Sequence, residues 1–159
     1  MTEIIWNWIA RRLSRPAVAR KIIAHAQQYP YKHLGSYMSR WWLIRERSWL
    51  PFAIRIQHIK RPDSEHVLHD HPWNFRTIIL RGWYIEENVY GGKVLRRPGT
   101  TATRRAEEFH RIDDMSEAGV VTMFITYRKR QKWGFMVNTP AGPRKILHTD
   151  FESANNRIQ

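Results

Sequence analysis

The stretch "LHDHPWNFRTIIL" at residues 68–80 carries the strongest structural signal in the chain. It joins an H-x-H pair, His69 and His71, to a run of β-branched and aromatic residues that is typical of a strand. On an extended backbone, residues two apart point to the same face, so these imidazoles lie about 7 Å apart. They can then meet one metal ion at about 2.0–2.2 Å. Pro72 favours the extended conformation for His71. The stretch therefore predicts a strand that presents two metal ligands, although an H-x-H pair alone is also compatible with polar surface or capping residues.

A third ligand has to come from elsewhere in the chain. His66 stands an odd number of residues from the pair and is expected to point away from the ion. His110, in "EEFHRID" at residues 107–113, lies on another strand candidate and is the favoured partner. His58 and His148 are weaker candidates.

The sequence around this stretch is rich in strand patterns. Residues 52–61, "FAIRIQHIKR", alternate with a period of two, with Ile54 and Ile56 on one face and Arg55 and Gln57 on the other. Further candidates are 75–90 (broken at Gly82), 100–113, 119–129 and 132–138, and Gly91–Gly92 predicts a hairpin turn. Many short strands at this spacing predict a mainly β sandwich or barrel.

The segments at the two ends differ from this β-rich centre. Residues 2–28 show helical periodicity, with Ser14 as a cap candidate and Pro16 in the first turn of a second helix. The predicted apolar faces are Ile5, Trp8, Ile9 and Leu13 in the first helix, and Ala19, Ile22, Ile23 and Ala26 in the second. We expect a basic helical segment over 1–47 that packs on the domain, a barrel over 48–138 and a polar tail over 139–159. Helices of this kind can also lie on a membrane surface.

Composition bounds the partners and the compartment. The chain has 159 residues, no cysteine and a net charge of +13. The absence of cysteine excludes disulfides, thiolate ligands and a thiol nucleophile, which fits a cytoplasmic protein. No apolar run approaches the roughly 20 residues that span a bilayer. The positive charge, concentrated in 1–47 and in "YRKRQK" at 127–132, leaves nucleic acid open as a partner beside a small-molecule substrate.

The histidine arrangement resembles the cupin superfamily, whose first motif is G-x5-H-x-H-x(3,4)-E-x6-G and whose second is G-x5-P-x-G-x2-H-x3-N. His69 and His71 match the paired histidines, Gly82 the closing glycine and His110 the second-motif histidine. The glutamate position falls on Phe75 or Arg76, the opening glycine of the first motif is absent, Pro-x-Gly falls on Arg105 and Glu107, and Asp114 stands for the asparagine. The pattern "HDHPW…F…ILRG…YxE" also resembles small cupin-like proteins of bacteria and phages. The likeness covers about residues 50–137.

This resemblance implies a double-stranded β-helix, the cupin jelly roll, with His69, His71 and His110 as ligands of a divalent metal. A cupin with three histidines and no glutamate is similar to cysteine dioxygenase, so the resemblance favours Fe(II), with Zn, Ni or Mn as alternatives. Neutral imidazole ligands leave the ion its full charge and open positions for substrate and oxygen. A cupin that has lost its metal and only binds a ligand is the alternative.

Strand alternation predicts the surroundings of the ion. Trp73, Phe75 and Thr77 follow His71 on its face and would line the substrate pocket, with Trp133 closing it; core packing is the alternative for Trp133. Tyr84 and Glu108 are the candidate catalytic residues. By alternation Glu108 shares the face of His110 and would replace the missing carboxylate, either orienting a ligand or serving as a fourth one. The alternatives are a buried core tyrosine and an edge-strand charge. Arg76 faces outward, as do Ile78 and Leu80, which need cover from the amino-terminal helices or from a second subunit in a homodimer.

Three functions follow. The first is a metal-binding cupin, specifically a non-haem Fe(II) oxygenase acting on a small anionic substrate. The second is a basic module that binds nucleic acid or protein without catalysis. The third is a metal-independent isomerase or epimerase of sugar nucleotides, in which His71 or His110 would work with Tyr84. The fold alone does not separate them, because one fold hosts many chemistries.

Overall fold

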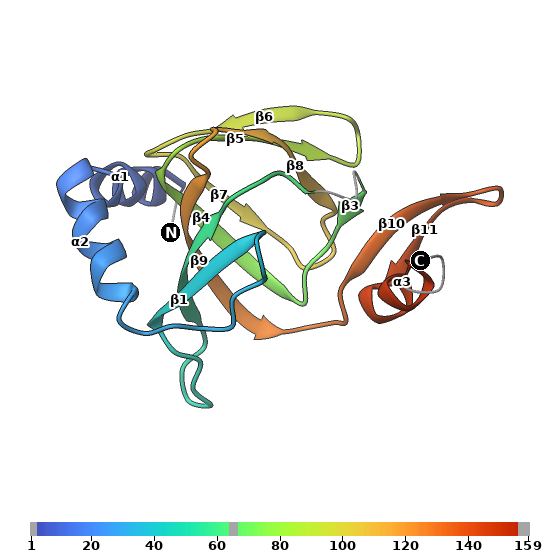
Figure 1. Cartoon of the computed structure of the whole chain (residues 1–159), viewed down its shortest axis with the longest axis horizontal. Helices are drawn as coiled ribbons and strands as arrows, with labels where there is room; N and C mark the ends of the chain where they lie inside the picture. The colour runs from blue at the N-terminus through green and yellow to red at the C-terminus, as the bar shows by residue number, and fades with distance from the viewer. Residues whose placement is uncertain (1–2, 64–66, 156–159) are drawn as a thin grey trace.

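The computed structural model describes residues 3–63 and 67–155, and Figure 1 shows their arrangement. Helices α1 and α2 lie against one side of a β-barrel, and β10, β11 and α3 extend its opposite end (Figure 1). The elements in chain order are α1 (Glu3–Leu13), α2 (Pro16–Ala26), β1 (Met38–Ile44), β2 (Ala53–Ile59), β3 (Leu68–His69), β4 (Trp73–Arg81), β5 (Tyr84–Asn88), β6 (Lys93–Arg96), β7 (Thr101–Arg104), β8 (His110–Met115), β9 (Val120–Lys129), β10 (Gly134–Thr139), β11 (Gly142–Leu147) and α3 (His148–Asn155).

The strands form two antiparallel sheets. Sheet A has the order β1-β2-β9-β4-β7, and sheet B has the order β11-β10-β3-β8-β5-β6. Neighbours within each sheet come from distant parts of the chain, as when β9 pairs with both β2 and β4. The mainly β prediction is confirmed, and the break at Gly82 and the hairpin at Gly91–Gly92 lie where the sequence predicts them.

Sheet A is buried on both faces. Its outer face carries Ile56, Ile78 and Leu80, which form one apolar cluster with the helix residues Ala10 and Ala19. The amino-terminal helices therefore supply the cover that Ile78 and Leu80 require. Its inner face looks toward sheet B and holds several polar side chains, which places the largest apolar core outside the barrel rather than inside it.

The packing face of α1 differs from the predicted one. Trp6, Ile9, Ala10 and Leu13 face the cluster, whereas Ile5 and Trp8 are 42% and 58% exposed. The cause is rotational: the stripe through residues 6, 9, 10 and 13 is equally helical in spacing, and Ala10 allows the helix to approach the sheet closely. For α2, the predicted face is confirmed, with its residues all in or against the cluster.

Ser14 is not the cap of α2. Arg15 occupies that position with no side-chain capping bond, and Pro16 begins the helix as predicted. The Ser14 hydroxyl instead donates to the carbonyl of Arg11 at 3.4 Å, at the end of the preceding helix. Ser14 follows the last residue of α1, and its amide also donates to the Ala10 carbonyl at 3.0 Å, so it completes the end of the first helix rather than beginning the second.

The end segments contain more β-structure than the sequence indicates. Residues 38–44, inside the segment expected to be helical, form β1 and pair with β2. Residues 139–159, expected to be a polar tail, contain β11 and α3, and β11 pairs with β10 along its length. Within the described ranges, no helix is long and apolar enough to cross a membrane.

Candidate metal centre

Three histidines from two separate segments of the chain converge in the barrel. His69 on β3 is the direct register partner of His110 on β8, and His71 follows β3 by two residues. One ring nitrogen from each residue can be chosen so that all three lie within 4.8 Å of one another. The structure thus brings together the three predicted ligands, and their role as ligands stays a prediction. His58 and His148 lie outside this group, and His66 lies outside the described residues.

The geometry fits a metal ion. The Nε2 atoms of His71 and His110 face each other at 2.9 Å. Two nitrogens bound to one ion at about 2.0–2.1 Å, at a right angle, lie about 3 Å apart. The two atoms are therefore placed either as ligands of a common ion or as donor and acceptor of one hydrogen bond. The donor set is three neutral imidazoles, which suits a borderline divalent cation such as Fe(II), Zn, Ni or Mn.

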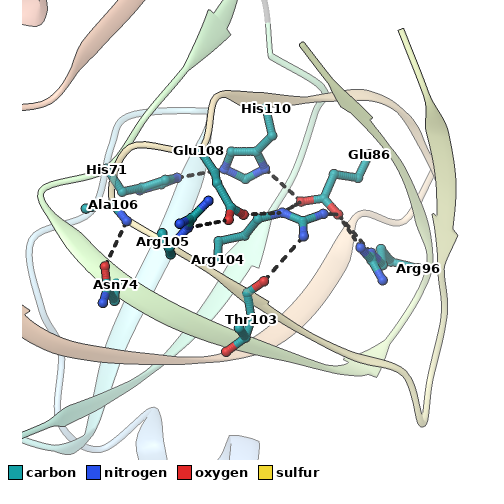
Figure 2. Close-up of polar contacts among 10 residues, drawn as sticks. All are labelled: His71, Asn74, Glu86, Arg96, Thr103, Arg104, Arg105, Ala106, Glu108 and His110. Atoms are coloured by element: carbon teal, nitrogen blue, oxygen red, sulfur yellow. Dashed lines mark hydrogen bonds and ion pairs between the residues drawn. The ribbon is translucent and has the colours of Figure 1, made fainter. Parts of the chain in front are cut away.

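Glu86 on β5 is the carboxylate of this centre, and the sequence analysis did not select it. Its Oε1 lies 2.8 Å from Nδ1 of His110, and its carboxylate also pairs with Arg96 and Arg104 at 2.7 Å each (Figure 2). Its side chain is 3% exposed. Burial raises the pKa of Glu86, but the hydrogen bond from His110 and the charges of His110, Arg96 and Arg104 outweigh burial and hold that pKa well below its ordinary value.

An ionised Glu86 fixes the tautomer of His110. A carboxylate can only accept a hydrogen bond, so Nδ1 of His110 carries a proton and donates it to Glu86; whenever the ring is neutral, its lone pair is on Nε2, which faces His71. Buried carboxylates that orient metal-binding histidines in this way are common in metal sites.

Glu108, the predicted carboxylate, lies elsewhere. It is in the turn that precedes β8, it is 37% exposed, and it pairs with Arg105 at 3.1 Å (Figure 2). The expectation that Glu108 shares the face of His110 assumed that both residues lie on one strand. Glu108 is outside the strand, because β8 begins at His110. Glu86 could have been found by strand alternation. It stands two residues after Tyr84, so its side chain lies on the same face of β5 as that of Tyr84, which was expected to point into the pocket.

Burial also determines the state of His71. It lowers the pKa of His71 well below the ordinary value, and repulsion from His110, His69 and Arg55 acts in the same direction. His71 is therefore neutral at physiological pH, which is the form that binds metals.

His69 has an acidic neighbour as well. The Asp63 carboxylate lies 3.7 Å from Nδ1 of His69, and it accepts hydrogen bonds from the Tyr37 hydroxyl at 2.6 Å and the Ile112 amide at 2.7 Å. Asp63 stands six residues before His69, where the cupin motif would have its opening glycine. Two of the three imidazoles are thus flanked by buried carboxylates.

A cavity of about 290 Å³ opens beside the histidines, between the two sheets. The structure places Trp73, Phe75, Thr77, Tyr84 and Trp133 in its lining, while Glu108 is not part of that lining. Burial, followed by the charge of Glu86, raises the pKa of Tyr84 far above its ordinary value, so its hydroxyl stays protonated. The roles of these residues toward a substrate stay predictions.

The sequence analysis missed the contribution of β2 to the cavity. Arg55 and Gln57 were assigned to the face opposite Ile54 and Ile56, which is correct, but that face was not connected with the pocket. Both side chains are buried, at 3% and 7% exposure, and both line the cavity. Alternation alone did not show that the polar face is the interior one.

Asp70, between the two paired histidines, points away from them as expected. It is 1% exposed, accepts from the Gly134 amide at 2.7 Å and from Gln131 at 2.9 Å, and pairs with Lys145 on β11. Gln131 also donates to the His71 carbonyl at 3.0 Å. Asp70 therefore joins the histidine segment to the C-terminal hairpin.

No family model matches the chain, and no curated protein sequence is significantly similar to it. Solved structures do match. The DMSP lyase DddQ from Ruegeria pomeroyi aligns with a TM-score of 0.58 and 13% identity, over 74% of this chain and 66% of that one. A sugar phosphate isomerase of the cupin superfamily from Silicibacter pomeroyi gives 0.53 and 11%, over 76% and 87%. A cupin 2 conserved barrel domain protein from Rhodopseudomonas palustris gives 0.52 and 13%, over 80% and 82%. At these identities the likeness is one of fold, and it shows that the chain is a cupin jelly roll.

Proposed function

We propose that this cupin-fold chain binds one divalent metal ion through His69, His71 and His110 and acts on a small anionic substrate in the adjoining cavity. The observation that carries the proposal is the convergence of three imidazoles within 4.8 Å, one of them fixed by a buried, ionised carboxylate. Fe(II) is the favoured metal, which makes a non-haem oxygenase the specific form of the proposal.

The roles of the chain's own residues follow from their contacts. Glu86 orients the His110 ring by accepting a hydrogen bond from its Nδ1, and burial lowers the pKa of His71, which favours the neutral, metal-binding form of that ring. The rings of Phe75 and Phe124 lie 4.4 and 5.9 Å from the His71 ring and exclude water from that side. A bound Fe(II) would supply redox chemistry with dioxygen, and a bound Zn, Ni or Mn ion would polarise a substrate oxygen.

A metal-independent isomerase or epimerase is the second candidate, because His110 and Glu86 form a buried dyad that could transfer a proton. The sequence analysis paired His71 or His110 with Tyr84 for this reaction; burial raises the pKa of Tyr84, which makes its hydroxyl a weak proton donor. Activity that survives a chelator would favour this candidate.

The test is elemental analysis of untagged protein purified without added metal. We expect about one transition-metal ion per chain, absent from a His69→Ala/His71→Ala double variant and retained by His25→Ala, which removes an exposed histidine on α2. Iron would justify oxygen-uptake assays with small acids. No metal in the wild type, also after reconstitution with Fe(II) or Zn, would contradict the proposal.

A further inference from the structure

We propose that Arg55 binds the substrate through a carboxylate, so that the substrate class is a small carboxylic acid. This inference deepens the proposed function and rests on it. It names the anion and the residue that holds it, neither of which the three histidines identify.

Arg55 is placed on the cavity wall close to the histidines. Its register partner on β9 is Phe124, which pairs in turn with Thr77 on β4, so the three residues form a row across sheet A. All three line the cavity. The Arg55 guanidinium carbon lies 5.4 Å from the Phe124 ring centre, and the His71 ring lies 5.9 Å from the same ring. The arginine and a histidine of the candidate metal centre thus lie near the same phenyl ring.

No carboxylate lies in direct contact with Arg55. Its side chain is 3% exposed, and among the residues that the structure describes it forms no ion pair within 4 Å. Its Nε has no hydrogen-bond partner, while Tyr31 forms a hydrogen bond with the guanidinium and the Glu46 carboxylate acts on it only at longer range. Its guanidinium is surrounded by aromatic rings instead, with Trp73 at 4.8 Å and Trp42 at 5.7 Å.

The buried Arg76 and the half-buried Arg96, Arg104 and Arg111 provide the contrast, whereas Arg40, half-buried and also in the cavity lining, resembles Arg55 in having no ion pair within the described residues. Arg76 pairs with Glu3, Arg96 and Arg104 share Glu86, and Arg111 pairs with Glu87 and Asp113. A buried cation without a counter-charge is costly, and mutual pairing is the usual remedy. Arg55 departs from this pattern at the wall of the cavity, where a ligand anion can provide the counter-charge.

The surroundings favour a carboxylate over a phosphate. One guanidinium satisfies one carboxylate. Phosphate sites generally combine several cations or a row of backbone amides. Arg40, the other cavity arginine, already donates its Nε to the Lys32 carbonyl at 2.7 Å, and the described lining contains no lysine. The cavity, at about 290 Å³, is small and has several aromatic walls, so the rest of the acid is compact.

The experiment titrates chelator-treated protein with three probes of one shape: phenylacetate, its neutral amide phenylacetamide, and phenyl phosphate. Quenching of tryptophan fluorescence reports binding, because Trp73 and Trp42 flank Arg55. We expect the wild type to bind phenylacetate at least tenfold more tightly than the amide. Arg55→Gln should lose that preference, and Arg128→Gln, which removes an exposed charge on β9, should keep it.

Three outcomes would overturn the inference: no binding of phenylacetate to the wild type, an unchanged preference in Arg55→Gln, or tighter binding of phenyl phosphate than of phenylacetate. If Arg55→Gln does not fold, Arg55→Lys decides, since it keeps the charge. We then expect weaker binding of phenylacetate with the preference over the amide retained, and equal binding of the two probes would contradict the proposal.

The outcome is separable from that of the proposed function, because metal content is measured on the same preparations before the chelator is added. A protein that holds metal but does not distinguish acid from amide would leave the metal proposal standing and remove this one. A protein that distinguishes the acid from the amide but never holds metal would remove the metal proposal and leave the carboxylate-binding role of Arg55 standing.

Discussion

Glu86 is the residue on which the polar interior of the barrel depends. It satisfies two arginines and one histidine at once, from a side chain that is 3% exposed. Glu108, only two residues from His110 in sequence, pairs with the exposed Arg105 at 3.1 Å and reaches Arg104 only at 4.0 Å, at the edge of this network. The two glutamates therefore offer a matched comparison between a buried carboxylate and a surface one.

We predict that Glu86→Gln destabilises the protein by about 3 kcal/mol, because it leaves two largely buried arginines without a counter-charge. The same change should weaken metal binding by about 10–100-fold, since the Nδ1 proton of His110 loses its carboxylate acceptor. Urea unfolding and metal titration measure the two effects.

Glu108→Gln is the control for this comparison. We expect a change within about 0.5 kcal/mol and unaltered metal binding, because exposed ion pairs contribute little. Equal effects of the two substitutions would show that Glu86 has no special role.

At the scale of elements, the sequence was most informative where one periodicity left a single solution. The strands around Gly82, the hairpin at Gly91–Gly92 and the packing face of α2 were predictable for this reason. The packing face of α1 was not, because apolar residues surround much of that helix and two stripes have helical spacing. The choice between Trp6 and Trp8 depends on the sheet beneath the helix, which local sequence does not encode.

The residues of the candidate site also differ in whether the sequence could place them. His69 and His71 share a face by strand alternation, and their meeting with His110 could be anticipated from the cupin resemblance. Glu86 and Arg55 could not be placed, because each required knowing which face of a strand is the interior one. In most β-proteins apolar residues mark the interior, whereas here the polar face of β2 lines the cavity and the apolar face packs on helices.

The two tryptophans of α1 provide a test at this scale. We predict that Trp6→Ala lowers the free energy of unfolding by about 2 kcal/mol, because Trp6 packs on the apolar cluster and lies 4.5 Å from the Arg76 guanidinium. Trp8→Ala should cost less than about 1 kcal/mol, since Trp8 is 58% exposed. Chemical denaturation checks both values, and a larger cost for Trp8 would contradict the observed face.

The contact between α1 and β4 is also pH-dependent. Glu3 pairs with Arg76 at 2.6 Å, and this hydrogen bond, opposed by burial, lowers the pKa of Glu3. A lowered folded-state pKa means that the stabilisation is present above the ordinary carboxyl pKa of about 4.3 and is lost as pH falls through the lowered value.

We therefore expect Glu3→Gln to be less stable than the wild type by about 0.5 kcal/mol at pH 7 and equally stable near pH 3. Unfolding curves between these values measure the difference. Glu117→Gln, at an exposed position, should match the wild type throughout. A stability gap that persists at pH 3 would exclude the ion pair as its cause.

At the scale of the whole molecule, the two faces of sheet A differ in what they contribute: one packs against the helices and the other lines the cavity. The outer face packs against α1 and α2 in the larger of the two apolar clusters, while the inner face carries the cavity with Arg55, Gln57 and Thr122. Stability and binding are thus carried by opposite sides of the same strands.

This division predicts separable effects. Leu80→Ala should lower stability by about 3 kcal/mol, because Leu80 is 3% exposed in the outer cluster, and should leave the metal content unchanged. Leu95→Ala, at a residue that is 51% exposed, should change stability by less than about 0.5 kcal/mol. Denaturation and elemental analysis of the same samples check the prediction, and metal lost in proportion to stability would contradict it.

The bond between Asp70 and Lys145 has a consequence for the order in which the protein is made. The two residues are 75 positions apart in the chain. At about 5–20 residues per second, roughly 4–15 s of synthesis pass between them. For that time the histidine segment has been made, but the hairpin that anchors it has not. The contact that anchors the histidine segment to the hairpin therefore forms well after that segment has been made, and the buried Asp70 carboxylate is without its lysine partner during this interval.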